Sequence, residues 1–166
     1  TMLYGTWTKG FKSGGFDARS NGHPDPAVVN GSNALAGTDI VGSFEFDREE
    51  AETIELGSKM SLADGAAELN VALYRTEFTD LQTSQFDGVL GFNVTNAGEA
   101  TVQGLEVDGR WAVTESLVLT ASGAYLDFNF DDFPNSQCAF GQAPNSPDFP
   151  GLCDQTGKRK EYTPEY

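Results

Sequence analysis

The sequence predicts an all-β fold in which antiparallel strands form one sheet, and three observations support this. Apolar and polar side chains alternate with a period of two over several long segments. Turn-forming residues such as Asp64-Gly65 separate some of these segments. The composition, with 19 glycines, 12 phenylalanines and 5 tyrosines in 166 residues, favours strands and turns over helices.

The first expected strand runs from Leu3 to Phe11. Leu3, Gly5, Trp7 and Phe11 alternate with more polar or smaller residues, and Lys9 is the single break in the pattern. Residues 13–47 are rich in Gly, Asn, Asp, Pro and Ser and show no sustained period. They predict a long acidic loop.

The second and third expected strands form a hairpin. Residues 54–62 alternate, with Glu55 and Lys59 on the polar face, and residues 69–74 alternate again. Residues 63–66 lie between these two strands and contain the Asp-Gly pair that marks a tight turn. A second loop is expected over residues 81–96.

The fourth expected strand begins near Ala100 and has the clearest pattern in the chain. Its apolar face carries Leu105, Val107, Trp111 and Val113, and its charged face carries Glu106, Asp108 and Arg110. A short turn at residues 114–116 leads into a fifth strand at residues 117–125.

The segment 127–160 is predicted to be a third long loop, because it holds four prolines and both cysteines. Cys138 and Cys153 have fourteen residues between them, a spacing suited to a loop-closing disulfide in an oxidising compartment. Two unrelated free thiols are the alternative. Residues 162–166 are expected to begin a sixth strand.

Loop lengths favour an outer-membrane β-barrel over a soluble sandwich. The connections alternate long, short, long, short, long, so every long loop falls at one end of the sheet, as in such barrels. The strands reach about ten residues, and Trp7, Trp111 and Tyr125 lie near strand ends, where a membrane interface would hold them. No window approaches the ~20 apolar residues of a membrane helix.

Charge and residue content exclude several classes of function. A net charge of −15 opposes nucleic-acid binding. The single histidine, His23, lacks the neighbours that a catalytic triad or metal site requires, so we expect no enzyme, no catalytic residue, no metal site and no cofactor. Asp127, Asp131 and Asp132 offer oxygen ligands for calcium, but a solvated acidic loop is the preferred interpretation.

Several motifs resemble the barrel of TonB-dependent outer-membrane receptors. Residues 8–16, TKGFKSGGF, are similar to that family's "SKGFKSGGF" stretch, and residues 52–59, ETIELGSK, resemble its "YELGLK" strand. Asp80-Leu81-Gln82 resembles "DLQ", and residues 96–107 resemble "NAGKA…GVELE". Residues 125–127 and 162–165 also match stretches near the end of such receptors, so the resemblance spans nearly the whole chain.

The resemblance implies a 22-stranded barrel closed by a globular plug and energised by the TonB complex. On this interpretation residues 1–166 supply five to six strands of a partial barrel, and the plug and the remaining strands are absent. The expected partners are outer-membrane lipid, the TonB complex through the missing N-terminal part, and a small-molecule or metal-chelate substrate. The protein would import an iron-siderophore complex, cobalamin or an oligosaccharide across the bacterial outer membrane.

Two other functions remain open from the sequence. One is a complete small outer-membrane barrel of eight strands, and the other is a soluble β-sandwich that binds carbohydrate.

Candidate site residues follow from the strand pattern and from the loops. The charged residues expected to face the barrel lumen are Glu55, Lys59, Glu106, Asp108 and Arg110. The aromatic residues near loop bases that are candidates for ligand contact are Phe16, Phe86, Phe92, Phe128 and Phe130.

Overall fold

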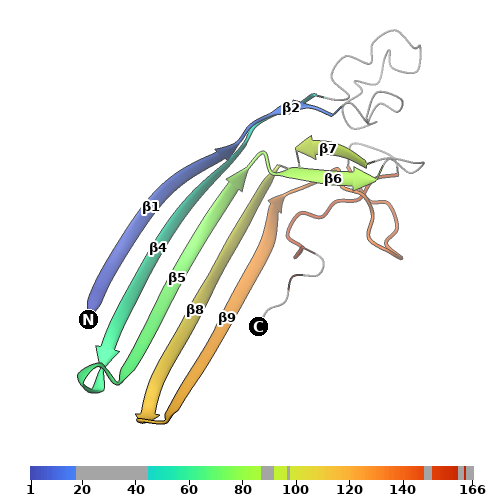
Figure 1. Ribbon diagram of the computed structural model, residues 1–166. Coiled ribbons are helices and arrows are strands. Elements are labelled where there is room, and N and C mark those ends of the chain that lie inside the picture. The colour runs from blue at the N-terminus through green and yellow to red at the C-terminus, as the bar shows by residue number, and fades with distance from the viewer. Residues whose placement is uncertain (18–44, 87–91, 97, 148–150, 161–162, 164–166) are drawn as a thin grey trace, which may run out of the picture.

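The structure is a computed structural model that describes residues 1–17, 45–86, 92–96, 98–147, 151–160 and 163. These residues form an open, curved sheet of five strands and two short two-stranded ladders (Figure 1). The sheet strands are β1 (Met2–Lys12), β4 (Glu49–Leu62), β5 (Ala67–Thr79), β8 (Glu99–Thr114) and β9 (Leu117–Asp132). Every neighbouring pair is antiparallel, in the order β1-β4-β5-β8-β9, so the predicted fold class is confirmed.

The connections differ at the two ends of the sheet, as the sequence predicted. At one end, which we call the turn end, the 3-10 turn η3 (Ala63–Gly65) joins β4 to β5, and two residues join β8 to β9. At the other end, the loop end, long segments join β1 to β4 and β5 to β8. Within the described residues the structure contains no helix long and apolar enough to cross a membrane.

The long connections contain structure that the sequence did not predict. The first carries the ladder β2 (Gly15–Phe16) with β3 (Glu45–Phe46), and residues 18–44 of the predicted acidic loop lie outside the described residues. The second, predicted as a loop, is a hairpin of β6 (Gln82–Phe86) and β7 (Phe92–Asn96). Both ladders are too short and polar to show a clear period of two.

Strand register sorts the side chains of the sheet onto two faces. Because successive residues of a strand point to opposite sides, directly paired residues share a face. One row is Gly5, Leu56, Leu73, Leu105 and Tyr125, on a side that we call the Trp face because Trp7 and Trp111 also lie there. The next row is Tyr4, Gly57, Ala72, Glu106 and Ala124, on the opposite side, which we call the pocket face.

Large apolar side chains on the Trp face are exposed. Trp7 is 65% exposed and Leu56 is 61% exposed. The other large apolar residues exposed on this face are Leu3, Phe11, Ile54, Leu62, Leu73, Trp111, Val113, Leu117, Leu119 and Tyr125. Their chain neighbours on the pocket face are mostly polar or small, so the sheet has one apolar and one polar side over much of its length.

Two strands extend further toward the loop end than the sequence predicted. β4 begins at Glu49 rather than near Ile54, and β9 continues to Asp132 rather than ending near Tyr125. On the Trp face the extensions carry charged and polar groups, such as Glu52, whose carboxylate lies 2.9 Å from Lys9 Nζ and accepts a 2.6 Å hydrogen bond from Trp7 Nε1. In these extensions apolar and polar residues no longer alternate, although the strands remain paired through their backbones.

The predicted loop 127–160 is largely a continuation of β9 and a return segment beside it. The Phe130 N–H donates to Lys158 O, the Gly157 N–H donates to Phe130 O, and Asn129 and Arg159 form an antiparallel bridge. Ser136 and Cys153 exchange backbone hydrogen bonds further along. Residues 157–159 thus pair with Phe130 and Asn129 of β9, whereas the predicted sixth strand at residues 162–166 lies, apart from Thr163, outside the described residues.

Burial is concentrated at the loop end of the pocket face. Ala100, Phe128, Phe130 and Phe133 form a buried cluster, and Phe78, Leu81, Val102 and Leu126 pack against it. The rings of Phe128 and Phe130 meet edge-on with centroids 5.1 Å apart, and Phe130 and Phe133 are 5.0 Å apart. This cluster fixes β9 and the segment after it against β5 and β8.

Two tyrosines lie over glycines of the next strand on the pocket face. Tyr4 is the register partner of Gly57, and Tyr74 is the partner of Gly104. A Cβ atom at Gly104 would lie 2.6 Å from Tyr74 Oη, and one at Gly57 would collide with the Tyr4 ring. Each ring covers a position where only a glycine leaves space, an arrangement that pins strand register.

We predict that Gly104→Val destabilises the intact protein by about 1–3 kcal/mol, because the side chain would collide with the backbone oxygen of Tyr125, 2.5 Å from the added Cβ atom, and with the Tyr74 ring. The denaturant midpoint measured in detergent checks this. Gly123→Val is the matched control, since a Cβ atom at Gly123 meets nothing within 4 Å. Equal effects of the two substitutions would show that the close approach of Tyr74 and Tyr125 to Gly104 does not limit stability.

Candidate functional site

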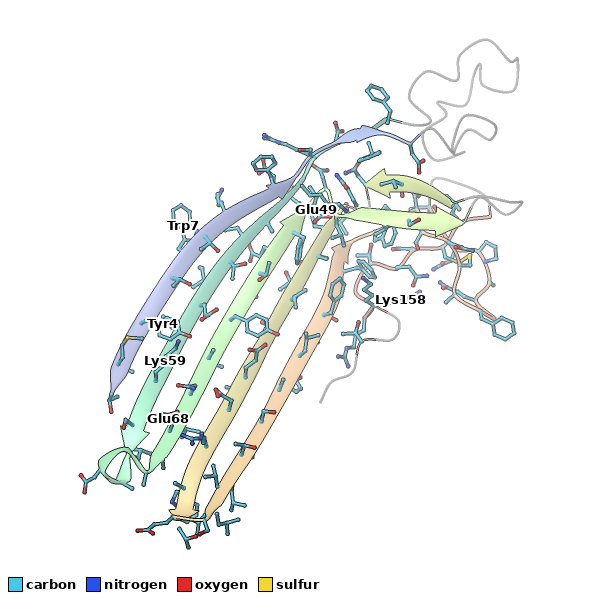
Figure 2. The ribbon with its side chains drawn as sticks, in the orientation of Figure 1. Tyr4, Trp7, Glu49, Lys59, Glu68 and Lys158 are labelled. Atoms are coloured by element: carbon cyan, nitrogen blue, oxygen red, sulfur yellow. A yellow bond between two sulfur atoms is a disulfide. The ribbon has the colours of Figure 1, made fainter. Side chains whose placement is uncertain are left out.

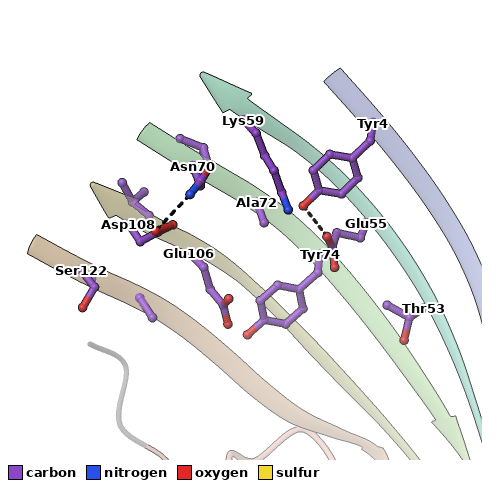
Figure 3. Close-up of a pocket in the computed structure, with 14 residues that line it drawn as sticks. Tyr4, Thr53, Glu55, Lys59, Asn70, Ala72, Tyr74, Glu106, Asp108 and Ser122 are labelled. Atoms are coloured by element: carbon purple, nitrogen blue, oxygen red, sulfur yellow. Dashed lines mark hydrogen bonds between the residues drawn. The ribbon is translucent and has the colours of Figure 1, made fainter. Parts of the chain in front are cut away.

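A wide hollow of about 830 Å³ lies on the pocket face (Figure 3). Its wall is supplied by all five sheet strands, and neighbouring rows of the ladder place its polar side chains together. Its polar lining comprises Tyr4, Thr53, Glu55, Lys59, Asn70, Tyr74, Glu106, Asp108 and Ser122. Three carboxylates and one ammonium group make the hollow acidic on balance.

Hydrogen bonds hold several of these side chains across strands. Tyr4 Oη donates to Glu55 Oε1 at 2.7 Å, and Asn70 Nδ2 donates to Asp108 Oδ1 at 3.1 Å. Lys59 Nζ lies 5.9 Å from the centre of the Tyr4 ring, within range of a cation–π contact. Figure 3 shows these groups pointing into the same hollow from adjacent strands. The arrangement can bind a polar surface, and we find no nucleophile and base paired for catalysis among these lining residues.

Four of the five charged residues predicted to share a face line the hollow. They are Glu55, Lys59, Glu106 and Asp108. Arg110 lies on the same face nearer the turn end, where its register partners are Glu68 and Thr120. That this face lines a barrel lumen stays a prediction.

Sequence reasoning missed five polar members of the hollow, namely Tyr4, Thr53, Asn70, Tyr74 and Ser122. All five stand at the polar positions of alternating segments, and that alternation was the signal that could have identified them. Their contribution depends on register, because Tyr74 meets Glu106 and Gly104 only through the pairing of β5 with β8. A pattern within one strand does not give that pairing.

At the loop end, amide side chains join the two long connections by hydrogen bonds. Asn96 Oδ1 accepts the Asp47 N–H at 2.8 Å, while its Nδ2 donates to Asp47 O and Asp80 O at 3.1 and 2.7 Å. Gln82 Nε2 donates to Ser13 O and Asp47 O at 3.1 and 2.9 Å. We call this group the rim network.

The rim network sits where the β6–β7 hairpin bends away from the sheet. Asp80 and Gly98 flank the bend with φ values of 54° and 80°, and the Leu81 N–H donates to Gly98 O. A Cβ atom at Gly98 would collide with Asp132 O, so the bend requires a glycine there. Residues 80–82 together with Asn96 and Gly98 thus orient this hairpin.

The five aromatic candidates for ligand contact have different environments. Phe16 is 72% exposed, whereas Phe128 and Phe130 are buried in the cluster at the loop end. The side chains of Phe86 and Phe92 lie outside the described residues. Ligand contact by any of the five stays a prediction.

The three aspartates considered as calcium ligands lie in β9 rather than in a loop, which corrects the prediction of their environment. Asp131 accepts a hydrogen bond from Thr101 Oγ1, and Asp127 accepts hydrogen bonds from Gln103 Nε2 and Asn129 Nδ2. Within the described part of the chain, no group of three or more His, Cys, Asp or Glu side chains is placed to hold a metal ion.

The predicted disulfide is present. Cys138 and Cys153 are joined with an S–S length of 2.07 Å and a Cα–Cα distance of 4.9 Å. Asp154 then accepts the Thr156 N–H at 2.8 Å, and hydrogen bonds from the Thr156 hydroxyl and N–H lower the pKa of its carboxyl group. The bridge and this turn shape the segment that returns to β9.

We predict that Asn96→Ala loosens the rim network and lowers local stability by about 1–3 kcal/mol, because it leaves backbone groups of residues 47 and 80 without their partner. Hydrogen exchange at the Asp47 amide measures the effect. Asn70→Ala, which removes one exposed side-chain hydrogen bond, is the control. Unchanged exchange at Asp47 would contradict the assigned role of Asn96.

Replacing both cysteines by serine is predicted to destabilise the segment between them by about 3 kcal/mol in the chain-entropy model. The expected readout is faster proteolytic cleavage between residues 138 and 153. Cleavage at sites near the turn end provides the internal control, since the sheet there makes no contact with the bridge. An unchanged cleavage rate would show that the bridge contributes little to ordering this segment.

Comparison with known proteins identifies the family. The family described as "TonB dependent receptor-like, beta-barrel" matches residues 1–165. The chain is 33% identical over 82 residues to "Probable TonB-dependent siderophore receptor PiuA" of Acinetobacter baumannii, a match that covers 49% of this chain and 10% of that protein. It is 34% identical over 91 residues to "Metal-pseudopaline receptor CntO" of Pseudomonas aeruginosa, which covers 55% of this chain and 12% of that protein.

The chain thus matches about a tenth of the length of these relatives. No solved structure matches it with statistical significance. The family consists of receptors and transporters, not enzymes, in agreement with the prediction from the sequence. The match along residues 1–165, together with the antiparallel sheet, shows that this chain belongs to the β-barrel family of TonB-dependent receptors.

Proposed function

We propose that this chain forms part of the barrel wall of an outer-membrane receptor that imports a metal chelate of the siderophore class. The observation that carries the proposal is the exposed apolar Trp face, which runs across all five sheet strands opposite a polar pocket face. Soluble proteins rarely expose so large an apolar surface, whereas a transmembrane barrel presents it to lipid.

The extent of the apolar surface supports a membrane-facing role. Along β8 it runs from Leu105 to Val113, a span of about 27 Å at ~3.4 Å per residue. Spanning a band of about 25 Å with strands tilted by ~40° requires roughly 30 Å of strand. Trp111 lies near one end of this span, and Trp7 and Tyr125 lie near the other, where aromatic girdles would meet the two interfaces.

Charged residues mark where the apolar rows of the Trp face end. Beyond the apolar rows, the Trp face carries Lys9, Glu52, Arg75 and Glu77, and ion pairs join Lys9 to Glu52 and Arg75 to Glu77. These rows lie toward the loop end. We place the loop end outside the cell and the turn end in the periplasm, since barrels of this class keep short turns on the periplasmic side.

The pocket face would then line the lumen. Glu55, Lys59, Glu106, Asp108 and Arg110 would contact a plug domain or the substrate route, and the acidic hollow would favour a basic patch on its partner. The plug, the remaining strands of a presumed 22-stranded barrel and the segment that engages the TonB complex would come from other parts of the whole protein.

The relatives favour a metal chelate as the substrate. One is named as a siderophore receptor and the other as a metal-pseudopaline receptor. Neither name mentions cobalamin or an oligosaccharide, the other substrate classes that the resemblance implied. Uptake against a gradient would require the TonB complex.

Uptake of radiolabelled ferric chelates by cells that carry only this receptor tests the proposal. We expect accumulation that disappears when the tonB gene is deleted and returns on complementation. Accumulation that persists without TonB would contradict the receptor mechanism. Recovery of the intact protein in the soluble fraction would instead favour a β-sandwich.

We predict that Val71→Arg lowers the amount of receptor assembled in the outer membrane. Val71 is paired with Val107 inside the apolar span, and an arginine facing lipid costs about 2–4 kcal/mol near the bilayer midplane. Heat-modifiable migration on gels measures the folded fraction. Ala72→Arg is the matched control, since Ala72 is next in sequence but lies on the pocket face. A larger defect for Ala72→Arg would reverse the assignment of the two faces.

A further inference from the structure

A second cavity, of about 320 Å³, lies at the loop end, away from the large hollow. It is bounded by the start of β6 and by the segment that follows β9, and Phe130 of the pocket face contributes to its wall. The lining residues that carry the argument are Thr83, Phe130, Phe133, Gln155, Arg159 and Lys160. A ligand that entered the receptor from outside would pass this position first.

The cavity is cationic although the chain is strongly acidic. Lys158, Arg159 and Lys160 are consecutive and make up three of only ten basic residues in a chain of net charge −15. Arg159 and Lys160 line the cavity, and no aspartate or glutamate is among its described lining residues. Figure 2 labels Lys158, which lies outside the lining and donates from Nζ to Asp154 O at 2.8 Å.

The two lining cations differ in how they are held. Arg159 Nη2 donates to Leu126 O at 3.1 Å, and Arg159 Nε lies 3.8 Å from Asp127 Oδ1, so this guanidinium has a fixed place. Lys160 is exposed, and its Nζ lies 5.7 Å from the centre of the Phe128 ring. Within the described residues the structure gives Lys160 no carboxylate partner within 4 Å. Its ammonium group is therefore available to an anion.

The rest of the wall combines aromatic rings with a hydroxyl donor. Phe130 and Phe133 of the buried cluster line the cavity, with their centroids 5.0 Å apart and their planes at 54°. A further ring can join such a tilted array, because aromatic pairs prefer offset and edge-to-face contacts. The buried Thr83 Oγ1 has no hydrogen-bond partner among the described residues. It can donate to an oxygen bound in the cavity.

We infer that this cavity binds one anionic aromatic ring, an aromatic carboxylate or phenolate carried by the transported chelate. Lys160 provides the charge-assisted hydrogen bond, Arg159 adds positive potential, and the phenylalanines contact the ring. The volume is at the small end of the usual range for ligand sites, which suits one ring-bearing arm and not a whole chelate. The inference rests on the proposed function and narrows its substrate class.

Binding of salicylate to the whole detergent-solubilised receptor, followed by calorimetry, tests the inference. We expect salicylate to bind the wild type and Lys160→Gln to weaken binding about tenfold, as for loss of one charge-assisted hydrogen bond. Lys160→Arg should restore most of the affinity. Lys158→Gln removes the same charge two residues away and should change the affinity by less than about twofold.

Two further probes distinguish the contribution of the aromatic ring from that of the negative charge. Cyclohexanecarboxylate has the charge without an aromatic ring, and benzamide has the ring without the charge. Both should bind at least about tenfold more weakly than salicylate. Equal weakening of salicylate binding by Lys158→Gln and Lys160→Gln would overturn the site. It would indicate that salicylate responds to the general positive potential of residues 158–160 and not to a contact with Lys160. Equal affinity for cyclohexanecarboxylate and salicylate would also overturn it, as would absence of salicylate binding to the wild type.

The two proposals fail in different ways. TonB-dependent uptake of aromatic chelates that is unaffected by Lys160→Gln would refute the cavity and leave the transport function. Salicylate binding that depends on Lys160, in a receptor whose uptake is independent of TonB, would refute the transport mechanism and leave the cavity.

Discussion

The register of the antiparallel ladder is the constraint on which the rest of this structure depends. Pairing runs from Met2 opposite Lys59 through to Thr114 opposite Leu117, and each pair fixes which side chains share a face. A slip of one residue would move the apolar set to the polar side of a strand. The Tyr4–Gly57 and Tyr74–Gly104 contacts oppose such a slip, because each ring fits only above a glycine.

The register places the large apolar side chains on one face of a single sheet, and little of that face is buried. The described residues bury one small phenylalanine cluster at the loop end, while large apolar groups of the Trp face remain exposed. A sheet of this kind takes its stability from backbone hydrogen bonds and from the medium on each side. In hydrocarbon, unpaired backbone groups cost several kcal/mol each, so a complete ladder matters more than a core.

The loop end is organised differently from the rest of the sheet. The rim network orients the β6–β7 hairpin, the phenylalanine cluster fixes the chain after β9, and the Cys138–Cys153 bridge closes the segment that returns to β9. Together these contacts bring β6 close to residues 155–160, which lie about seventy positions away in sequence. The binding cavity at this end therefore depends on the rim network, the phenylalanine cluster and the disulfide, and not on the pairing of the five sheet strands alone.

The sequence by itself determined the class of fold, the positions of five strands, the two short turns, the disulfide and the receptor family. Apart from the family, which was recognised from motifs along nearly the whole chain, these follow from local signals. A period of two, an Asp-Gly turn or a pair of nearby cysteines can be recognised within about twenty residues. The charged members of the pocket face, such as Glu106 and Asp108, were recognised for the same reason. Strand ends were less accurate, because the alternation of β4 and β9 disappears among the charged residues beyond Ile54 and Tyr125.

Only the tertiary structure decided which strands place their side chains together. The pairing of Tyr74 with Gly104, the bend at Asp80 and Gly98, and the meeting of Thr83 with Lys160 all join residues from different elements. None leaves a periodic signal in one segment, because each depends on register or on hydrogen bonds to distant backbone groups. The chain thus encodes its two faces locally, whereas its cavities arise only when the hairpins are assembled.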